Sequence, residues 1–236
     1  MKRILVIDDI ISIGKSGASV SLPIFSSLEL ESILVPSSVS YSSFNNNFTQ
    51  NLSKNFDSYI TGFSDDMIHF DAIYFTLSKS SSLDKLNSLI TSSFSNDTLI
   101  ICNTRNENPS QDILVFSNIV IGEEALKDKL SSRTHYLISF NKTISNDKRA
   151  VVIFDNETKE AKYIYYKKWY EEFSSLSDLF SAIVSAFYIN GMDIEKCVRN
   201  AIKFITQCFN DTTDPLYNFY GLSFEKKLPE LKNSGN

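Results

Sequence analysis

The sequence has little cysteine. Cys102, Cys197 and Cys208 are the three cysteines among 236 residues, and their spacing matches no metal-ligand motif. An odd number of cysteines indicates a reducing compartment rather than a disulfide framework. The first residues enter an apolar run without a cationic stretch or a cleavage site, so we expect a cytoplasmic protein.

The sequence also lacks a run of positive charge and a long apolar segment. The net charge is -5 and the isoelectric point is near 5.1, so the overall field repels nucleic acid and anionic lipid. No apolar stretch reaches the length that a membrane-spanning helix needs. We therefore expect neither nucleic acid nor a membrane as a partner.

Short apolar runs alternate with amphipathic segments along the chain, and 42% of its residues are hydrophobic. The runs predict strands at residues 3–7, 33–36, 70–75, 99–102 and 135–140, and a hairpin at 151–155 and 162–166. Helical periodicity predicts helices at residues 18–28, 83–94, 123–130, 178–189 and 193–209. Residues 37–51 are polar and typical of a loop. This alternation predicts one α/β domain over residues 1–236 with a mostly parallel sheet.

Ligands of open α/β sheets bind at the carboxyl ends of the strands. Asp178 is predicted there, in the first turn of a long helix, where backbone amides can hold a phosphate and a carboxylate can accept a proton. From the pattern alone, a helix cap at Ser177 or Asp178 is the favoured interpretation. Asp8 and Asp9 follow the first strand, where an aspartate pair forms a turn more often than a metal site.

Five stretches of the sequence, in order and at similar spacing, resemble the pyridoxal kinases of the ribokinase superfamily. The stretches are residues 4–24, which resemble an opening strand, glycine turn and helix, and residues 35–39, 70–74, 178–182 and 220–229. The resemblance implies a ribokinase-like fold, with a central, mostly parallel sheet flanked by helices on both faces. It also implies a homodimer that transfers the γ-phosphate of ATP to the 5′-hydroxymethyl group of pyridoxal or pyridoxamine, in vitamin B6 salvage.

The same resemblance implies roles for individual residues. Asp178 would be the catalytic base, and the amides of Ser175, Leu176 and Ser177 would form the anion hole. Ser139 would contact the ATP phosphates, and Glu124 and Glu107 would help to bind Mg²⁺. The substrate pocket would include Asp9, Ile11, Ser12 and Ser43.

The sequence departs from the family pattern where phosphate is handled. The family's Gly-Thr-Gly-Asp motif reads Ser175-Leu176-Ser177-Asp178, and its Asp-Pro-Val-Met-Gly-Asp segment becomes residues 102–107. Glycine lets a phosphate approach the backbone and adopts positive φ cheaply, and only seven glycines occur in the chain.

Three functional hypotheses therefore stay open. The first is a divergent kinase, acting on pyridoxal, pyridoxamine or hydroxymethylpyrimidine, because positioning and electrostatics do most of the work in phosphoryl transfer. The second is a catalytically inactive protein that binds a B6 vitamer or a nucleotide. The third is a structural partner subunit, for which the aromatic residues between 163 and 170 could form an interface, although covering a sheet edge is the favoured role.

Overall fold

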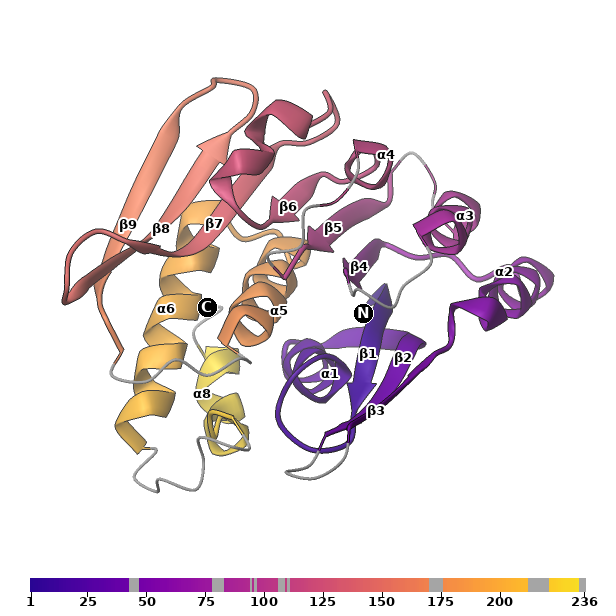
Figure 1. Cartoon of the computed structure of the whole chain (residues 1–236), viewed down its shortest axis with the longest axis horizontal. Coiled ribbons are helices and arrows are strands. Elements are labelled where there is room, and N and C mark those ends of the chain that lie inside the picture. The colour runs from indigo at the N-terminus through magenta and orange to yellow at the C-terminus, as the bar shows by residue number, and fades with distance from the viewer. Residues whose placement is uncertain are drawn as a thin grey trace.

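The structure is a computed structural model that describes residues 1–42, 47–77, 83–93, 95, 97–105, 109, 111–169, 176–211 and 221–233. These residues form a nine-stranded sheet in the order β3-β2-β1-β4-β5-β6-β7-β8-β9 (Figure 1). The strands are β1 Lys2–Ile11, β2 Leu30–Ser42, β3 Asn47–Asn51, β4 Ala72–Thr76, β5 Leu99–Asn103, β6 Ile119–Ile121, β7 Tyr136–Thr143, β8 Lys148–Asp155 and β9 Ala161–Lys167.

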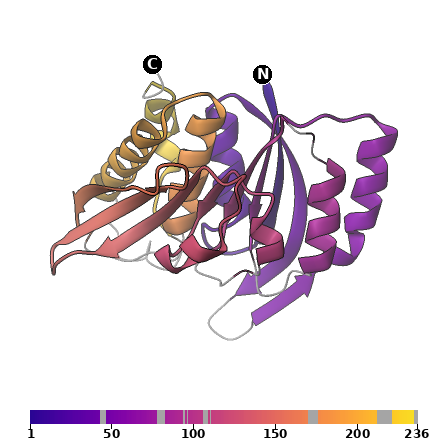
Figure 2. The same ribbon diagram turned by 90° about the horizontal axis from the view of Figure 1, so that it is seen from above.

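Helices cover both faces of this sheet (Figure 2). The α-helices are α1 Ala18–Ser27, α2 Phe56–Asp65, α3 Leu83–Ser93, α4 Gln111–Leu114, α5 Leu176–Ile189, α6 Ile194–Asp211 and α8 Leu228–Asn233. Short 3-10 helices are η1 Ser53–Asn55, η2 Glu124–Lys129 and η3 Glu225–Lys227. No helix in these described ranges is both long enough and apolar enough to cross a membrane.

The central strands are parallel and buried on both faces. β1 pairs in parallel with β2 and β4, and the parallel order continues through β5, β6 and β7, whereas β3, β8 and β9 are antiparallel. Ile4 and Val6 of β1 belong to the core beneath α1, α5 and α6, and Leu5 and Ile7 to the core beneath α2, α3 and α4. Continuous apolar runs produce this arrangement because successive strand residues point to opposite faces. The predicted α/β fold class is confirmed.

The polar segment 37–51 is not the predicted loop. Residues up to Ser42 extend β2, and residues 47–51 form the antiparallel strand β3 at the edge of the sheet. Ser37 and Ser38 are almost fully buried, and their hydroxyl groups donate to the carboxylate of Asp9 at 2.6 and 2.8 Å, which offsets the cost of burying them. Buried partners therefore allow a serine-rich segment to form a strand that hydropathy does not indicate.

Three of the other elements also differ from the sequence-based expectation. Helix α2 and strand β6 were not predicted, since α2 buries only Phe56 fully and β6 has three residues. Residues 124–129 form a 3-10 helix rather than an α-helix. Pro23 lies inside α1, where it removes one backbone donor without ending the helix.

Aromatic side chains of the β8–β9 region divide between core and surface. Trp169 is 8% exposed and packs on Tyr166 and Phe209, whereas Tyr163 and Tyr165 stack on each other and are exposed. Trp169 thus closes the core at this edge, as the sheet-cover interpretation predicts.

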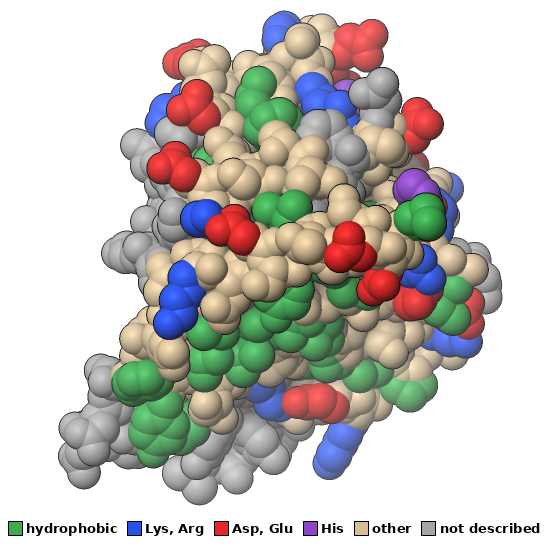
Figure 3. Space-filling model, turned by 90° about the vertical axis from the view of Figure 1, so that its right-hand side faces the viewer, with side chains coloured by type: hydrophobic (Ala, Val, Ile, Leu, Met, Phe, Trp, Pro, Cys, Tyr) green, Lys and Arg blue, Asp and Glu red, His purple; other side chains and the backbone are tan. Residues whose placement is uncertain are grey.

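A separate band of hydrophobic side chains, bordered by charged ones, appears on the face at the right of Figure 1 (Figure 3).

Candidate functional site

A partly buried arginine, Arg105, whose side chain is 18% exposed, lies at the carboxyl ends of β1 and β5. The Arg105 side chain donates from three different nitrogens to three aspartates. The donor–acceptor distances are 2.7 Å from Nε to Asp178 Oδ1, 2.7 Å from Nη1 to Asp9 Oδ2 and 2.9 Å from Nη2 to Asp8 Oδ1. We call these four residues the Arg105 cluster.

The backbone of β1 delivers two carboxylates to one guanidinium. Adjacent strand residues normally point to opposite faces, but the pairing of β1 with β2 shifts register between Asp8 and Ile10. Such an irregularity re-aims side chains, so that both Asp8 and Asp9 reach Arg105. The expected turn at this aspartate pair is wrong, because both residues lie within β1 and are buried.

Two residues at this site, Arg105 and Gly17, have positive φ. Arg105 itself has φ 46°, in the left-handed region. Gly17 has φ 61°, and a Cβ there would lie 2.3 Å from the carbonyl oxygen of Asp9 and 3.3 Å from Arg105 Nη2. Only glycine fits this position, since a side chain would collide with the backbone of β1.

Asp178 lies in the first turn of α5 and receives four donors. Oδ1 accepts from Arg105 Nε and, at 3.1 Å, from Asn103 Nδ2. Oδ2 accepts from the Ser16 hydroxyl at 2.5 Å and from the Gly17 amide at 2.9 Å. Because α5 begins at Leu176 and this carboxylate faces other elements, the favoured helix-cap interpretation of Asp178 is wrong.

The environment keeps Asp178 ionised although it is only 3% exposed. Burial by itself raises the pKa of a carboxyl group, but the Arg105 charge and the hydrogen bonds from Arg105, Ser16 and Gly17 outweigh it. The pKa of Asp178 is therefore held below its ordinary value. An ionised carboxylate at this place can accept a hydrogen bond from a hydroxyl group and orient it.

The pKa of Asp8 shifts in the opposite direction to that of Asp178. Burial raises its pKa from 3.8 to about 6, against the lowering effect of Arg105, and the nearby charge of Asp178 adds to the rise. Thr76 and Ser21 donate to its oxygens at 2.6 and 2.9 Å. Three carboxylates and one guanidinium carry a formal charge of -2, so protonation of Asp8 relieves the excess negative charge.

The predicted site residues separate into three groups. Asp9 and Asp178 meet at Arg105, and Ile11 and Ser12 follow at the end of β1, where the Ser12 amide donates to the Ser40 carbonyl. Ser139 and Glu124 lie farther along the sheet, on β7 and at the start of η2. Leu176 and Ser177 begin α5. Ser43, Glu107 and Ser175 lie outside the described residues.

Sequence reasoning missed the centre of the site. The sequence identifies Asn103 and Arg105 only as part of a segment that departs from a family motif, and it assigns no role to Ser16. The usable signal was the pair Asp8 and Asp9 at the end of a buried strand, since buried acidic residues require a cationic or hydrogen-bonding partner.

The described carboxylates do not fit a metal ion. Asp8, Asp9 and Asp178 surround a guanidinium, and Glu124 binds Lys142 at 2.5 Å. No group of three or more histidine, cysteine, aspartate or glutamate side chains in the described ranges is arranged to hold a metal ion. We therefore derive no chemical step through a protein-bound metal.

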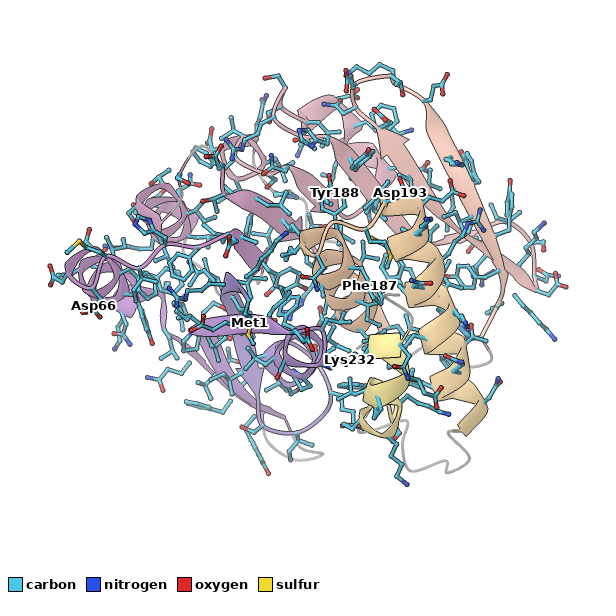
Figure 4. All side chains as sticks on the ribbon, turned by 180° about the vertical axis from the view of Figure 1, so that it is seen from behind. Met1, Asp66, Phe187, Tyr188, Asp193 and Lys232 are labelled. Carbon is cyan, nitrogen blue, oxygen red and sulfur yellow. The ribbon has the colours of Figure 1, made fainter. Side chains whose placement is uncertain are left out.

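A hollow lies at the opposite end of the sheet, between the ends of α1, α5 and α8 and the start of α6. Its volume is about 650 Å³, and Phe187, Asp193 and Lys232 are among its lining residues (Figure 4). Lys232 binds Glu29 at 2.6 Å, and Arg199 binds Glu195 at 2.6 Å. Because these charges neutralise each other on the surface, the Arg105 cluster is the stronger candidate site.

Several solved structures superpose closely on this chain over almost its whole length. A protein from Bacteroides thetaiotaomicron, assigned provisionally as a phosphomethylpyrimidine kinase and crystallised with pyridoxal, superposes with a TM-score of 0.84 at 17% identity. The match covers 98% of this chain and 95% of that chain. Pyridoxal kinase from Lactobacillus plantarum gives a TM-score of 0.82 at 12% identity, covering 98% and 96% of the two chains.

The chain has the ribokinase-like fold of the pyridoxal kinases. Pyridoxal kinase from Leishmania donovani, in complex with ADP and pyridoxamine, also matches, with a TM-score of 0.72, 9% identity and coverage of 98% and 96%. No family model matches the sequence, and no curated protein matches it. The superpositions establish the fold, while the chemistry must be argued from the site.

Proposed function

We propose that this protein is an ATP-dependent kinase of the pyridoxal kinase type, in which Asp178 orients and deprotonates the acceptor hydroxyl. One observation carries the proposal. A buried, ionised carboxylate in the first turn of a helix already accepts a hydrogen bond from a hydroxyl group, that of Ser16. A base that contacts the attacking hydroxyl is the central requirement of such a transfer.

The neighbouring residues supply the other parts of the reaction. The amides of Leu176 and Ser177, with that of Ser175, would receive the charge that develops on the transferred phosphoryl oxygens. Arg105 and Asn103 hold Oδ1 of Asp178, so that Oδ2 faces the acceptor. The acceptor is a hydroxymethyl group of pyridoxal or pyridoxamine, bound near Asp9, Ile11, Ser12 and Ser43.

ATP is the phosphoryl donor in this proposal. Its phosphates would lie near Ser139, and Mg²⁺ would arrive with the nucleotide, with Glu124 and Glu107 as the acidic residues that the family resemblance assigns to the ion. Lys142 would then have to release Glu124, to which it is bound in this structure. Two of the solved kinases described above bind pyridoxal or the pair ADP and pyridoxamine, which supports this choice of substrates.

A second candidate is a catalytically inactive protein that binds the same ligands, and the Arg105 cluster favours it. All four hydrogen-bonding positions of the Asp178 carboxylate are filled by donors from the chain itself. A substrate hydroxyl must displace one of them before it can reach the base. Ser16 is the donor that a substrate hydroxyl can displace most easily, because a serine hydroxyl can rotate away, whereas the guanidinium is held by three carboxylates.

The deciding experiment measures ADP release by the purified protein with ATP, MgCl₂ and pyridoxal. Pyridoxamine and hydroxymethylpyrimidine serve as alternative acceptors. Asp178→Asn should lower turnover by about a hundredfold or more, since positioned bases contribute on that order. Asp66→Asn, an exposed aspartate at the end of α2, is the matched control and should leave turnover unchanged (Figure 4).

Each outcome has a direct meaning. Turnover in the protein and in Asp66→Asn, but not in Asp178→Asn, supports the kinase. Equal ADP release by all three proteins would assign the signal to a contaminant. No turnover, combined with binding of ADP or pyridoxal in calorimetry, would favour the inactive binding protein. The expected homodimer is tested separately by light scattering of the eluted protein.

A further inference from the structure

The hydroxyl group on Asp178 belongs to the protein itself. Ser16 lies in the turn between β1 and α1, 162 positions before Asp178, and its Oγ donates to Asp178 Oδ2 at 2.5 Å. Ser16 is partly buried, so its hydroxyl is neither sealed in the core nor free in solvent. It occupies the position that an acceptor hydroxyl must take in the proposed kinase.

The backbone holds Ser16 in this position. The Ser16 amide donates to Ser19 Oγ at 3.2 Å, and Ser19 Oγ donates to the Ser16 carbonyl at 2.8 Å. The next amide, that of Gly17, donates to the same Asp178 oxygen at 2.9 Å. Two consecutive residues therefore bind one carboxylate oxygen, which keeps the Ser16 hydroxyl against the base.

The base is oriented in turn by a third set of groups. Arg105 and Asn103 donate to the other oxygen, Oδ1, from the end of β5 and the loop that follows it. A nucleophile within hydrogen-bonding distance of a base, with the base held by further partners, is the arrangement of an activated hydroxyl. Ser16, Asp178 and the pair Asn103 and Arg105 meet each part of this description.

We propose that Ser16 is itself a phosphoryl acceptor of this site. The inference rests on the proposed function, because it requires a nucleoside triphosphate bound with its γ-phosphate at the start of α5. Ser16 Oγ would attack the γ-phosphorus, the bond from that phosphorus to the bridging oxygen would break, and the nucleoside diphosphate would leave. The hydroxyl proton passes to Asp178 Oδ2, and the products are phosphoserine 16 and the diphosphate.

The geometry limits this reaction to one turnover for each chain. A phosphate on Ser16 remains beside the base and fills the place of the acceptor, so no second hydroxyl can reach Asp178. Its negative charge also lies next to an ionised carboxylate, which disfavours binding of another anionic phosphate. The modified protein is therefore expected to have lost its activity toward a small-molecule acceptor.

The test is phosphoryl incorporation without any vitamin present. The full-length protein is treated with phosphatase, the phosphatase is removed, and ATP and MgCl₂ are added. Intact-mass spectrometry follows the gain of one phosphoryl group, and peptide mapping locates it. Ser16→Ala should abolish incorporation, since the acceptor hydroxyl is gone, and Asp178→Asn should lower its rate by about a hundredfold, as loss of the base requires.

Ser26→Ala is the matched control, since Ser26 is an exposed serine of α1 and lies outside the site. It should incorporate phosphate as the unmodified sequence does. A second readout uses pyridoxal: Ser16→Ala removes the hydroxyl that competes for Asp178, so kcat/KM for pyridoxal should rise. A role of Ser16 in folding alone would lower both incorporation and kcat/KM.

The results separate this inference from the proposed function. Phosphate mapped to Ser16 supports it even if pyridoxal is not a substrate. Pyridoxal turnover with no phosphate on Ser16 overturns the inference and leaves the kinase in place. Phosphate on another residue also overturns it, and the absence of both reactions overturns the two proposals together.

Discussion

Replacing Arg105 by methionine tests the structural role of the Arg105 cluster most directly. Methionine keeps much of the side-chain volume and removes the guanidinium, so the three carboxylates lose their shared cation. Breaking a buried ion pair by removing one partner costs about 3–5 kcal/mol, because it leaves an uncompensated buried charge.

The remaining hydrogen bonds place the expected loss near the lower end of that range. Asp9 keeps the hydroxyl groups of Ser37 and Ser38, and Asp178 keeps Asn103 and the Gly17 amide. These donors still solvate the carboxylates after the guanidinium has gone. We therefore expect Arg105→Met to lower the free energy of unfolding by about 3 kcal/mol at neutral pH.

Urea unfolding followed by tryptophan fluorescence measures this loss. Trp169 is the single tryptophan of the chain, is 8% exposed and stacks on Phe209, so its emission reports loss of the core between β9 and α6. The matched control is Arg3→Met, which removes an exposed ion pair with Glu31 and should cost less than about 1 kcal/mol.

The double variant Asp8→Asn/Arg105→Met completes the test. Neutralising Asp8 removes one of the three stranded charges, so the double variant should be more stable than Arg105→Met alone by about 1 kcal/mol or more. Equal losses in Arg105→Met and Arg3→Met would refute the view that the cluster is a buried electrostatic centre. A double variant less stable than Arg105→Met would refute the charge argument.

Two further predictions concern the same cluster. Because burial raises the pKa of Asp8 from 3.8 to about 6, its contribution to stability is present at low pH and is lost as the pH rises through that interval. Relative to Asp8→Asn, the free energy of unfolding of the unmodified protein should therefore fall by on the order of 3 kcal/mol between about pH 4 and 7. If urea titrations show the same pH dependence of stability in both proteins, this prediction is contradicted. Gly17→Ala should lower the free energy of unfolding by more than about 2 kcal/mol, since the alanine would combine positive φ with a clash against the Asp9 carbonyl. Gly62 lies in α2 with open space around it, so Gly62→Ala should raise the free energy of unfolding by about 0.5–1 kcal/mol. Thermal unfolding measures both changes. Equal effects of the two alanines would contradict the packing argument.

Much of the fold could be predicted because its signals are local. The runs at residues 3–7 and 70–75 are apolar at every core position, and the periodicity of residues 178–189 and 193–209 marks α5 and α6. The register of the sheet could not be predicted in this way. The hydroxyl groups that make residues 37 and 38 suitable for a strand act only when Asp9, 28 and 29 positions away, is beside them.

The candidate site shows the same limit more sharply. Asp178 could be identified from its place at the start of a helix and from a family resemblance. Arg105 could not, because it stands 73 positions from Asp178 and 97 from Asp8, and its role exists only where the ends of β1, β5 and α5 meet. Long-range pairing of charges leaves no periodic pattern in a sequence.

The active kinase and the inactive binding protein predict opposite changes in pyridoxal turnover when Arg105 is removed from the Arg105 cluster. If Arg105 orients Asp178 for catalysis, the folded double variant Asp8→Asn/Arg105→Met should turn over pyridoxal more slowly than the unmodified sequence, because Oδ1 has lost its principal donor. If Arg105 instead closes the site, the same variant should gain turnover, because it frees one position on the base. The kinase proposal requires the first result, and a rise in turnover in this variant would show that the described structure is the inhibited state of the site.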